Sequence, residues 1–233
     1  MKVAGLQKLT LIDYPGKLAC TIFLHGCNFK CGFCHNPELV LDNEIEEIPQ
    51  NEVLDFLEKR KKYIEGVCFT GGEPLLSIDK EFLKKVKELG YLIKIDTNGC
   101  FPEILKKLID ESLVDYIAMD VKTNKGNYEL VVGAGVDFDK LEESMKLISN
   151  FPEYEFRTTI LESLHKKEDV EEMMEWLVDV AGKKLKRFRF QGFKNLGKLI
   201  NPELGDEKNT SEKYLNELVE IAKDYFEDVK VRV

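Results

Sequence analysis

The sequence contains no apolar run approaching 18 residues, and its first ten residues, MKVAGLQKLT, lack the apolar segment of a secretion signal. We therefore expect neither a membrane span nor a signal peptide. Basic residues are fewer than acidic ones: the sequence has 34 Lys and Arg and 43 Asp and Glu, which gives a formal net charge of −9. A nucleic-acid partner is not expected, since a phosphate backbone selects a concentrated basic face.

Internal repeats, linkers and low-complexity tracts are also missing from the sequence. A chain of 233 residues that is 43% hydrophobic has enough apolar side chains for one sizeable core, so a single domain over residues 1–233 is expected. The six cysteines are expected to be metal ligands or core residues and not disulfides, in a reducing cytoplasm.

Apolar segments alternate with amphipathic ones along the whole chain, which predicts strands alternating with helices. The predicted strands are residues 18–24, 67–70, 91–96, 115–121, 154–160, 187–190 and 229–233. The predicted helices are residues 53–63, 81–89, a segment that begins at Pro102, 138–148, 170–180 and 211–226. This alternation favours an α/β fold with a parallel sheet, and six units in this length fit an incomplete (β/α)6 TIM-like barrel. In such a barrel the chemistry lies at the C-terminal ends of the strands.

Three cysteines occur within eight residues of the segment GCNFKCGFCHNP, with the spacing C-x3-C-x2-C. They are Cys27, Cys31 and Cys34, and the segment offers no fourth cysteine. A cubane iron–sulfur cluster has four irons and prefers thiolate ligands. Three thiolates would therefore bind three irons and leave the fourth open to a small molecule.

Two other metal sites remain open on the cysteine spacing. A structural zinc site needs four ligands, and the fourth would be His25, His35 or a distant cysteine. A closed ferredoxin-type cluster also needs a fourth cysteine. Cys20, Cys68 and Cys100 each stand alone, as small buried cysteines do.

Further polar motifs follow the predicted strands. The segment FTGGEPLL follows the second strand, DTNG ends the third, and MDVK ends the fourth. Two glycines after a strand allow close backbone approach to a ligand, although a plain strand-to-helix turn also favours them. Asp96 can equally cap a turn, Asp120 can be a solvated strand end, and Arg157 can pair with a glutamate. All of these motifs would meet at one end of a parallel barrel.

The cysteine triad resembles the signature of the radical S-adenosylmethionine (SAM) superfamily, and GGE, DTNG and D-x-K resemble segments of the glycyl-radical-enzyme activating enzymes. Within that group the chain is most similar to the anaerobic ribonucleoside-triphosphate reductase activating proteins, above all over residues 12–41. The resemblance implies a [4Fe–4S] cluster on the three cysteines of the triad, which carry the catalysis. It also implies a monovalent cation held by Asp96 and Asp120. The SAM-binding residues it implies are Phe33, Gly71, Gly72, Glu73, Asp96, Thr97, Asn98, Asp120, Lys122 and Arg157.

The segment Asp13-Tyr14-Pro15-Gly16 stands where the activating enzymes carry a D-G-P-G element. There the resemblance implies that Asp13 meets the substrate peptide, although Tyr14 departs from the pattern. His35 follows the third cysteine, as in the activating enzymes, and is expected to be a loop residue in the cluster environment and not a ligand.

The resemblance implies an enzyme that cleaves SAM reductively and removes an α-hydrogen from a glycine of a partner protein. The implied partners are a glycyl radical enzyme, most of all anaerobic ribonucleoside-triphosphate reductase, and an electron donor such as flavodoxin or ferredoxin. One alternative is a radical SAM enzyme with a small-molecule substrate, and another is a non-catalytic iron–sulfur protein. SAM cleavage would separate the second alternative from both enzymes.

Overall fold

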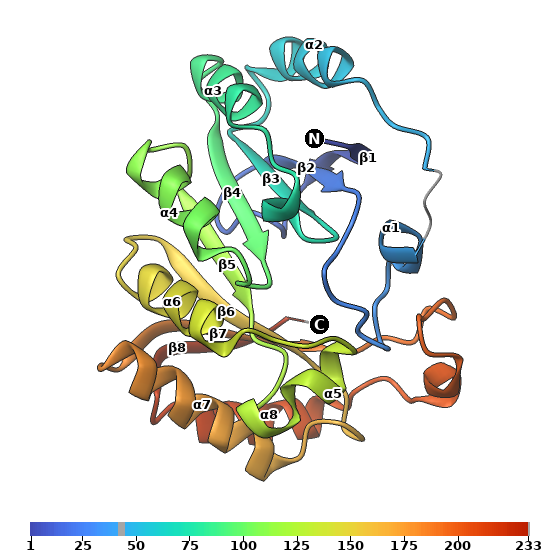
Figure 1. Cartoon of the computed structure of the whole chain (residues 1–233), viewed down its shortest axis with the longest axis vertical. Coiled ribbons are helices and arrows are strands. Elements are labelled where there is room, and N and C mark those ends of the chain that lie inside the picture. Colours follow the sequence, from blue (N-terminus) through green and yellow to red (C-terminus); the bar gives the residue numbers. More distant parts are fainter. Residues whose placement is uncertain (42–44, 233) are drawn as a thin grey trace. The chain divides into compact units, whose positions relative to one another are not determined.

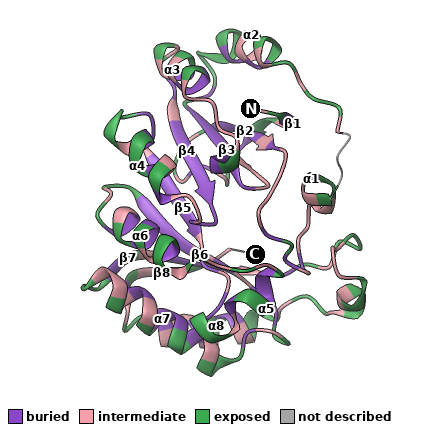
Figure 2. Cartoon of the chain, in the orientation of Figure 1, coloured by how far each residue is buried: buried purple, intermediate pink, exposed green. Residues whose placement is uncertain are grey.

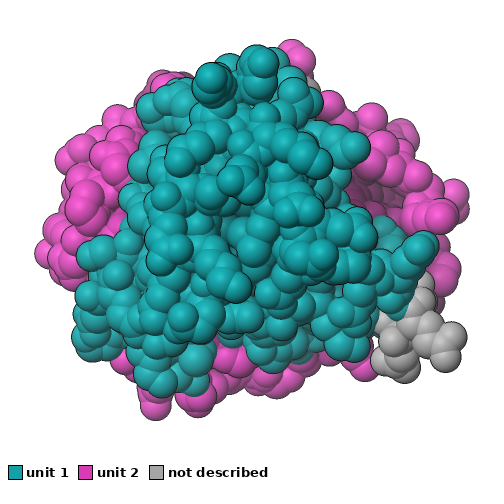
Figure 3. All heavy atoms as spheres, turned by 90° about the horizontal axis from the view of Figure 1, so that it is seen from above, with its two compact units in different colours: residues 1–28, 38–97, 103–117 teal, residues 29–37, 98–102, 118–233 magenta. Residues whose placement is uncertain are grey.

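The computed structural model describes residues 1–41 and 45–232 of the chain (Figure 1). These residues form two compact units, shown in separate colours in Figure 3. Unit 1 comprises Met1–Asn28, Glu38–Thr97 and Glu103–Ile117, and unit 2 comprises Phe29–Pro37, Asn98–Pro102 and Ala118–Val233. None of the described helices is long and apolar enough to cross a membrane.

The fold is α/β, with eight strands that follow chain order in a mostly parallel sheet. The strands are β1 Val3–Thr10, β2 Ala19–Leu24, β3 Gly66–Gly71, β4 Leu92–Thr97, β5 Tyr116–Asp120, β6 Tyr154–Ile160, β7 Leu185–Gly192 and β8 Phe226–Arg232. The α-helices are α1 Pro37–Leu41, α2 Gln50–Arg60, α3 Lys80–Glu88, α4 Pro102–Asp110, α5 Tyr128–Val132, α6 Phe138–Ser149, α7 Lys167–Ala181 and α8 Glu212–Ala222. The predicted alternation of strands and helices is therefore confirmed.

Unit 1 contains three parallel strands and one antiparallel strand. In the parallel set, Cys20 of β2 lies opposite Val67 of β3, which lies opposite Ile93 of β4. Strand β1 pairs antiparallel with β2, and the sequence analysis did not predict it. Its central residues are half-buried or exposed on both faces, so the segment lacks the apolar alternation by which strands are recognised.

Unit 2 contains three parallel strands, β6, β7 and β8, whose buried face carries aromatic rings. Phe156, Phe188 and Phe226 lie within contact distance of one another, with the Phe188 and Phe226 ring centroids 5.0 Å apart. Figure 2 shows that β6 is largely buried, whereas β8 is mostly half-buried or exposed. The last strand was predicted at residues 229–233. It is observed at Phe226–Arg232, and Val233 lies outside the described residues.

Local sequence signals fix the ends of several helices. Asp79, Asp137 and Ser211 each accept a hydrogen bond from the first turn of α3, α6 and α8, which is the role of an N-cap. Gly133 and Gly182 end α5 and α7 in the left-handed conformation that glycine adopts without strain. Pro102 opens α4, as predicted.

Candidate functional site

The cysteine loop begins in unit 1, where it is bound to the end of β3. The Gly72 N–H donates to the Leu24 carbonyl at 2.9 Å, and the Glu73 N–H donates to the Gly26 carbonyl at 2.8 Å. A Cβ placed on Gly72 would lie 2.0 Å from the Gly26 oxygen and 3.3 Å from the Cys27 nitrogen. Only a residue without a side chain fits there, so the GGE segment and the first cysteine are packed backbone to backbone.

The remainder of the loop belongs to unit 2. Its backbone is held by the Lys30 N–H, which donates to the Val132 carbonyl at 2.8 Å, and by the Gly32 carbonyl, which accepts from the Asn201 N–H at 2.9 Å. The Cys34 N–H donates to the Cys31 carbonyl at 3.0 Å, which closes a tight turn. Main-chain hydrogen bonds therefore hold the backbone of this part of the loop.

The Cys31 thiol is buried, and burial is the main reason that its pKa is raised above the ordinary value. The Lys122 ammonium opposes this effect, whereas Cys34 and Asp120 add to it. A buried thiol beside a lysine becomes a thiolate when a soft cation takes the place of its proton. The surroundings of Cys31 thus suit a metal ligand better than an exposed nucleophile.

The other three cysteines lie elsewhere in the fold. Cys20 and Cys68 are fully buried in β2 and β3, as expected for isolated cysteines, and burial raises the pKa of Cys20 to about 12. Cys100 is half-buried in the segment after β4. All six cysteines carry free thiols, in agreement with the expectation that none forms a disulfide.

Glu73 of the GGE motif is a buried carboxylate that joins two strand ends of unit 1. Its Oε1 accepts from the Leu75 N–H at 3.0 Å and from the Thr97 hydroxyl at 2.8 Å. Glu73 is only 1% exposed, so these bonds satisfy an anion that water does not reach. The carboxylate shapes the turn after β3, and it fixes Thr97 of the DTNG motif to that turn.

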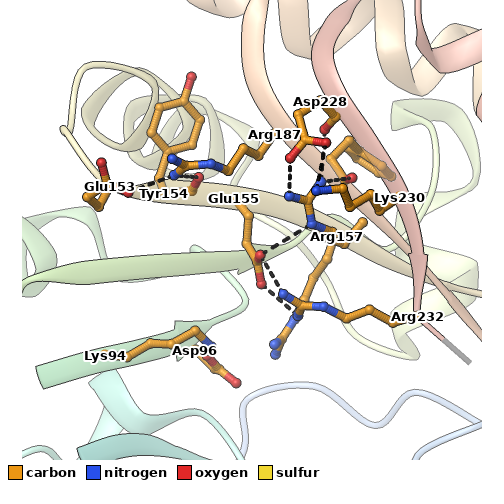
Figure 4. A network of polar contacts seen from close by, with 12 residues as sticks. Lys94, Asp96, Glu153, Tyr154, Glu155, Arg157, Arg187, Asp228, Lys230 and Arg232 are labelled. Atoms are coloured by element: carbon orange, nitrogen blue, oxygen red, sulfur yellow. Dashed lines mark hydrogen bonds and ion pairs between the residues drawn. The ribbon is translucent and has the colours of Figure 1, made fainter. Parts of the chain in front are cut away.

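Asp96 forms an ion pair with Lys94, which lies two residues earlier on β4 and on the same face (Figure 4). The Lys94 side chain is fully buried, and Asp96 is 7% exposed. Asp96 is therefore a member of a buried ion pair at the end of β4. Asn98 caps the turn that follows, because its side-chain oxygen accepts from the Cys100 N–H at 3.1 Å.

Asp120 and Arg157 form a two-point ion pair in unit 2. Arg157 Nε donates to Asp120 Oδ1 at 2.9 Å, and Arg157 Nη2 donates to Asp120 Oδ2 at 3.0 Å. Lys122 Nζ lies 3.6 Å from the same Oδ2. Arg157 thus pairs with an aspartate, and Asp120 is not merely solvated at a strand end.

Asp13 and Tyr14 occupy different environments in unit 1. Asp13 Oδ2 accepts from the Thr21 hydroxyl at 2.5 Å. Tyr14 is buried, packs against Tyr116 with 5.8 Å between ring centroids, and covers Gly66 so closely that a Cβ there would lie 2.7 Å from its ring. Tyr14, which stands where D-G-P-G has its first glycine, is thus a core residue next to Asp13.

Two aromatic residues of the cysteine loop pack within unit 2. Phe33 is buried edge-on against His165, with 6.2 Å between ring centroids. His35 stacks on Phe193 at 5.3 Å, and its Nε2 is buried without a hydrogen-bond partner among the described residues. A buried polar atom without a partner is costly, and a group bound at the adjacent Cys34 would supply one.

His165 was missed by the sequence analysis, although it fixes the D-x-K segment. Its Nδ1 lies 3.1 Å from the Leu161 N–H, which donates to it, so the ring proton is on Nε2. Nε2 then donates to the Lys122 carbonyl at 2.7 Å. Tyr214 donates its hydroxyl proton to the His165 carbonyl at 2.7 Å. A lone histidine in LESLHKK gives no local signal of this contact.

His165→Gln should flatten the dependence of stability on pH. Burial is the main cause that lowers the pKa of His165 from its usual 6.5, and the hydrogen bonds to the Lys122 and Leu161 backbone oppose it. At a pH near or below the usual pKa, the His165 side chain is protonated in the unfolded chain but stays neutral in the folded chain. The free energy of unfolding of the wild type therefore falls as the pH drops from about 7 to 5. One histidine contributes a slope of at most about 1.4 kcal/mol per pH unit.

Urea unfolding of both proteins at several pH values, followed by circular dichroism, measures this slope. His35, whose pKa is also lowered mainly by burial, should leave a residual slope in the variant. Equal slopes in the variant and the wild type would show that His165 does not titrate on unfolding.

A second polar surface that the sequence analysis did not predict lies on one face of β6, β7 and β8. The buried Glu155 carboxylate accepts from Arg232 at 2.8 and 2.7 Å, and Arg189 lies 3.8 Å from it (Figure 4). Arg189 also pairs with Asp228. In the strand register, Arg157 lies opposite Arg189 and Arg189 lies opposite Lys230. Three cations therefore share one row, and acidic neighbours compensate them.

The described residues fit an iron–sulfur cluster by the chemistry of their donors. Cys27, Cys31 and Cys34 are on one loop and form no disulfide, and the other cysteines lie on strands or beyond them. Within residues 1–41 and 45–232 no three His, Cys, Asp or Glu side chains are arranged around a single ion. The thiolates of a cluster bind different irons, so this arrangement is not required of them.

Comparison with known proteins gives the family. The radical SAM superfamily model matches residues 21–180. A protein of Methanocaldococcus jannaschii that bears the name glycyl-radical enzyme activating enzyme is 33% identical over 243 aligned residues, covering 99% of this chain and 95% of its own. The pyruvate formate-lyase-activating enzyme of Clostridium pasteurianum is 31% identical, with 58% of each chain covered.

Among solved structures, QueE from Escherichia coli is similar over 100% of this chain and 93% of its own, with a TM-score of 0.59 and 15% identity. This likeness confirms the predicted fold class, the α/β barrel type of the radical SAM proteins. The family implies a [4Fe–4S] cluster and SAM as cofactors, which favours the open cluster over the zinc and closed-cluster alternatives. The chain is an enzyme that belongs to the radical SAM superfamily and, within it, to the glycyl-radical enzyme activating enzymes.

Proposed function

We propose that this enzyme cleaves SAM reductively and uses the resulting radical to oxidise one glycine of anaerobic ribonucleoside-triphosphate reductase. One electron from a donor such as flavodoxin or ferredoxin and one SAM give methionine and a 5′-deoxyadenosyl radical. That radical takes a hydrogen atom from the glycine α-carbon, which yields 5′-deoxyadenosine and a glycyl radical. The observation that carries the proposal is the match over 99% of the chain to an activating enzyme.

The proposed roles of the residues follow from their positions. When bound, the cluster supplies the electron that breaks the S–C5′ bond of SAM. Cys27, Cys31 and Cys34 would each bind one iron and leave one iron for SAM. The other proposed SAM-binding residues are Phe33, Gly71, Gly72, Glu73, Asp96, Thr97, Asn98, Asp120, Lys122 and Arg157.

Protein side chains and backbone then orient SAM. Gly71 and Gly72 let the end of β3 pack directly against the backbone of residues 24–27, which fixes the start of the cysteine loop beside the proposed SAM site. Arg157 and Lys122 place two cations at the end of β5, where the carboxylate of SAM would be attracted. Asp13, which is half-buried and bonded to Thr21, would accept a hydrogen bond from a substrate peptide.

The choice of partner and the domain organisation belong to the same proposal. The segment Leu11-Ile12-Asp13-Tyr14-Pro15-Gly16 and the cysteine loop most resemble the activating proteins of anaerobic ribonucleotide reductases. Because the family match at residues 21–180 includes residues of both units, we take residues 1–233 as one radical SAM domain. Asp96 and Asp120 already have cationic partners, Lys94 and Arg157, so the monovalent cation implied by the resemblance is not part of this proposal.

The test is to mix the cluster-loaded enzyme with SAM, a reductant and the purified reductase without oxygen, and to record the electron paramagnetic resonance spectrum. A doublet that collapses when the glycine α-position carries deuterium is expected. The reductase with its glycine replaced by alanine is the matched control. If 5′-deoxyadenosine forms but no doublet appears with this reductase, the partner assignment is wrong, and other glycyl radical enzymes and small molecules become the substrates to test.

A further inference from the structure

Lys94 is a fully buried cation in strand β4 of unit 1. Its Nζ forms an ion pair with Asp96, lies 3.9 Å from Cys68 Sγ and lies 5.8 Å from the centre of the Tyr116 ring. Its side chain has no exposed surface. A buried ammonium is tolerated only when an anion compensates it, and Asp96 supplies that anion.

The position of this pair follows from the strand pattern of IKIDTNG. Lys94 and Asp96 are two residues apart, so they lie on the same face of β4, and the isoleucines lie on the other. Lys94 lies opposite Cys68 of β3, which lies opposite Thr21 of β2. Thr21 in turn donates to Asp13. Lys94 thus belongs to the polar face that carries the candidate SAM and substrate residues of unit 1.

Asp120 has cationic partners within unit 2. Arg157 binds both of its carboxylate oxygens at 2.9 and 3.0 Å, and Lys122 adds a second cation at 3.6 Å. Each of the two aspartates that the family resemblance assigns to a monovalent cation therefore has a cationic side chain of its own. An inorganic cation at Asp96 would face the Lys94 ammonium, and like charges in a buried site repel strongly.

We propose that Lys94 takes the place of the monovalent cation, so that SAM binding by this enzyme does not depend on Na⁺ or K⁺. The donor set around Asp96 does not fit an inorganic cation, because a covalently attached ammonium already compensates the carboxylate. The inference rests on the proposed SAM-binding role of Asp96. Lys94 acts through Asp96 as a positioning residue and is not assigned a contact with the reacting atoms.

The test measures SAM affinity of the cluster-loaded enzyme by isothermal titration calorimetry, without any partner protein. Potassium chloride, sodium chloride and tetramethylammonium chloride are compared at equal ionic strength. The wild-type dissociation constant should differ by less than about 2-fold among the three salts. A wild-type affinity that rises 10-fold or more in K⁺ or Na⁺ would overturn the proposal, whatever the variants do.

Lys94→Met removes the ammonium and keeps an apolar side chain of similar length. Its SAM affinity in tetramethylammonium should fall at least 10-fold and recover in K⁺ or Na⁺, and the double variant Lys94→Met/Asp96→Asn should lose this salt response. Lys87→Met is the matched control, since it removes a half-buried lysine that pairs with Asp115 on the same unit. It should leave the SAM affinity unchanged.

A second readout does not require SAM, which separates this inference from the proposed function. The melting temperature of Lys94→Met should rise in K⁺ relative to tetramethylammonium, because K⁺ can then compensate Asp96. The melting temperature of the wild type should not respond. If SAM fails to bind in every salt but the melting temperatures behave as expected, the proposed function fails and the internal compensation of Asp96 stands. If Lys94→Met shows no response to K⁺ in either measurement, Lys94 does not stand in for a cation.

Discussion

Replacing any one of Cys27, Cys31 and Cys34 by alanine should remove the cluster and abolish reductive SAM cleavage. The wild type should bind about four irons per chain after anaerobic reconstitution, and each variant should bind close to none. Loss is expected to be complete because the cluster supplies the electron, and two thiolates do not replace three. Iron and sulfide content, together with 5′-deoxyadenosine formed with dithionite, measure the effect.

The chain contains its own controls for this prediction. Cys20→Ala, Cys68→Ala and Cys100→Ala should keep the iron content of the wild type, although the first two leave small cavities in the core of unit 1. Circular dichroism on every variant separates loss of ligands from loss of fold. Full loss of iron in Cys68→Ala or Cys100→Ala, with the triad variants unaffected, would show that a different set of cysteines binds the cluster.

Gly72→Ala should destabilise the protein and disturb the cysteine loop at the same time. The new Cβ would lie 2.0 Å from the Gly26 oxygen, which is backbone and cannot move aside as a flexible side chain does. Overpacking at a rigid contact costs about 3 kcal/mol or more, so the melting temperature should fall by about 6 to 12 °C in a chain of this size. Iron content should fall with it, since Gly26 precedes Cys27.

Gly126→Ala is the matched substitution, because no atom lies within 4 Å of a Cβ at that position. Its melting temperature should stay close to that of the wild type. Calorimetry of the two variants side by side shows whether the effect at Gly72 comes from the close backbone contact. Equal melting temperatures for both variants would mean that the turn after β3 relaxes to admit a side chain.

The apolar strands and the motifs at their ends were predictable from the sequence. Residues 18–24 and 67–70 form near-continuous apolar runs, which only a strand buried on both faces explains, and the structure has β2 and β3 there. The triad and the GGE motif were recognisable because their residues are close together in sequence. Strand β1 was not predictable, because its central residues are half-buried or exposed and its apolar residues do not alternate.

Contacts between residues that are far apart in the sequence could not be predicted from the sequence. The pair of Asp120 and Arg157 joins residues 37 positions apart, and the bond from His165 to the Lys122 carbonyl spans 43. Both depend on which strands are neighbours and on their register. The pair of Lys94 and Asp96 did have a local signal, since two opposite charges two residues apart in a buried strand share one face.

The alternation of charge and aromatic rings in unit 2 bears on how its strands assemble during folding. In the native pairing Phe156 lies opposite Phe188, and Arg157 lies opposite Arg189. A slip of one residue between β6 and β7 would bring guanidinium groups onto the aromatic side and send rings among the ions. In that register the carboxylate of Glu155 would lose its arginine partners, so its ion pairs are expected to disfavour the slipped pairing relative to the native one.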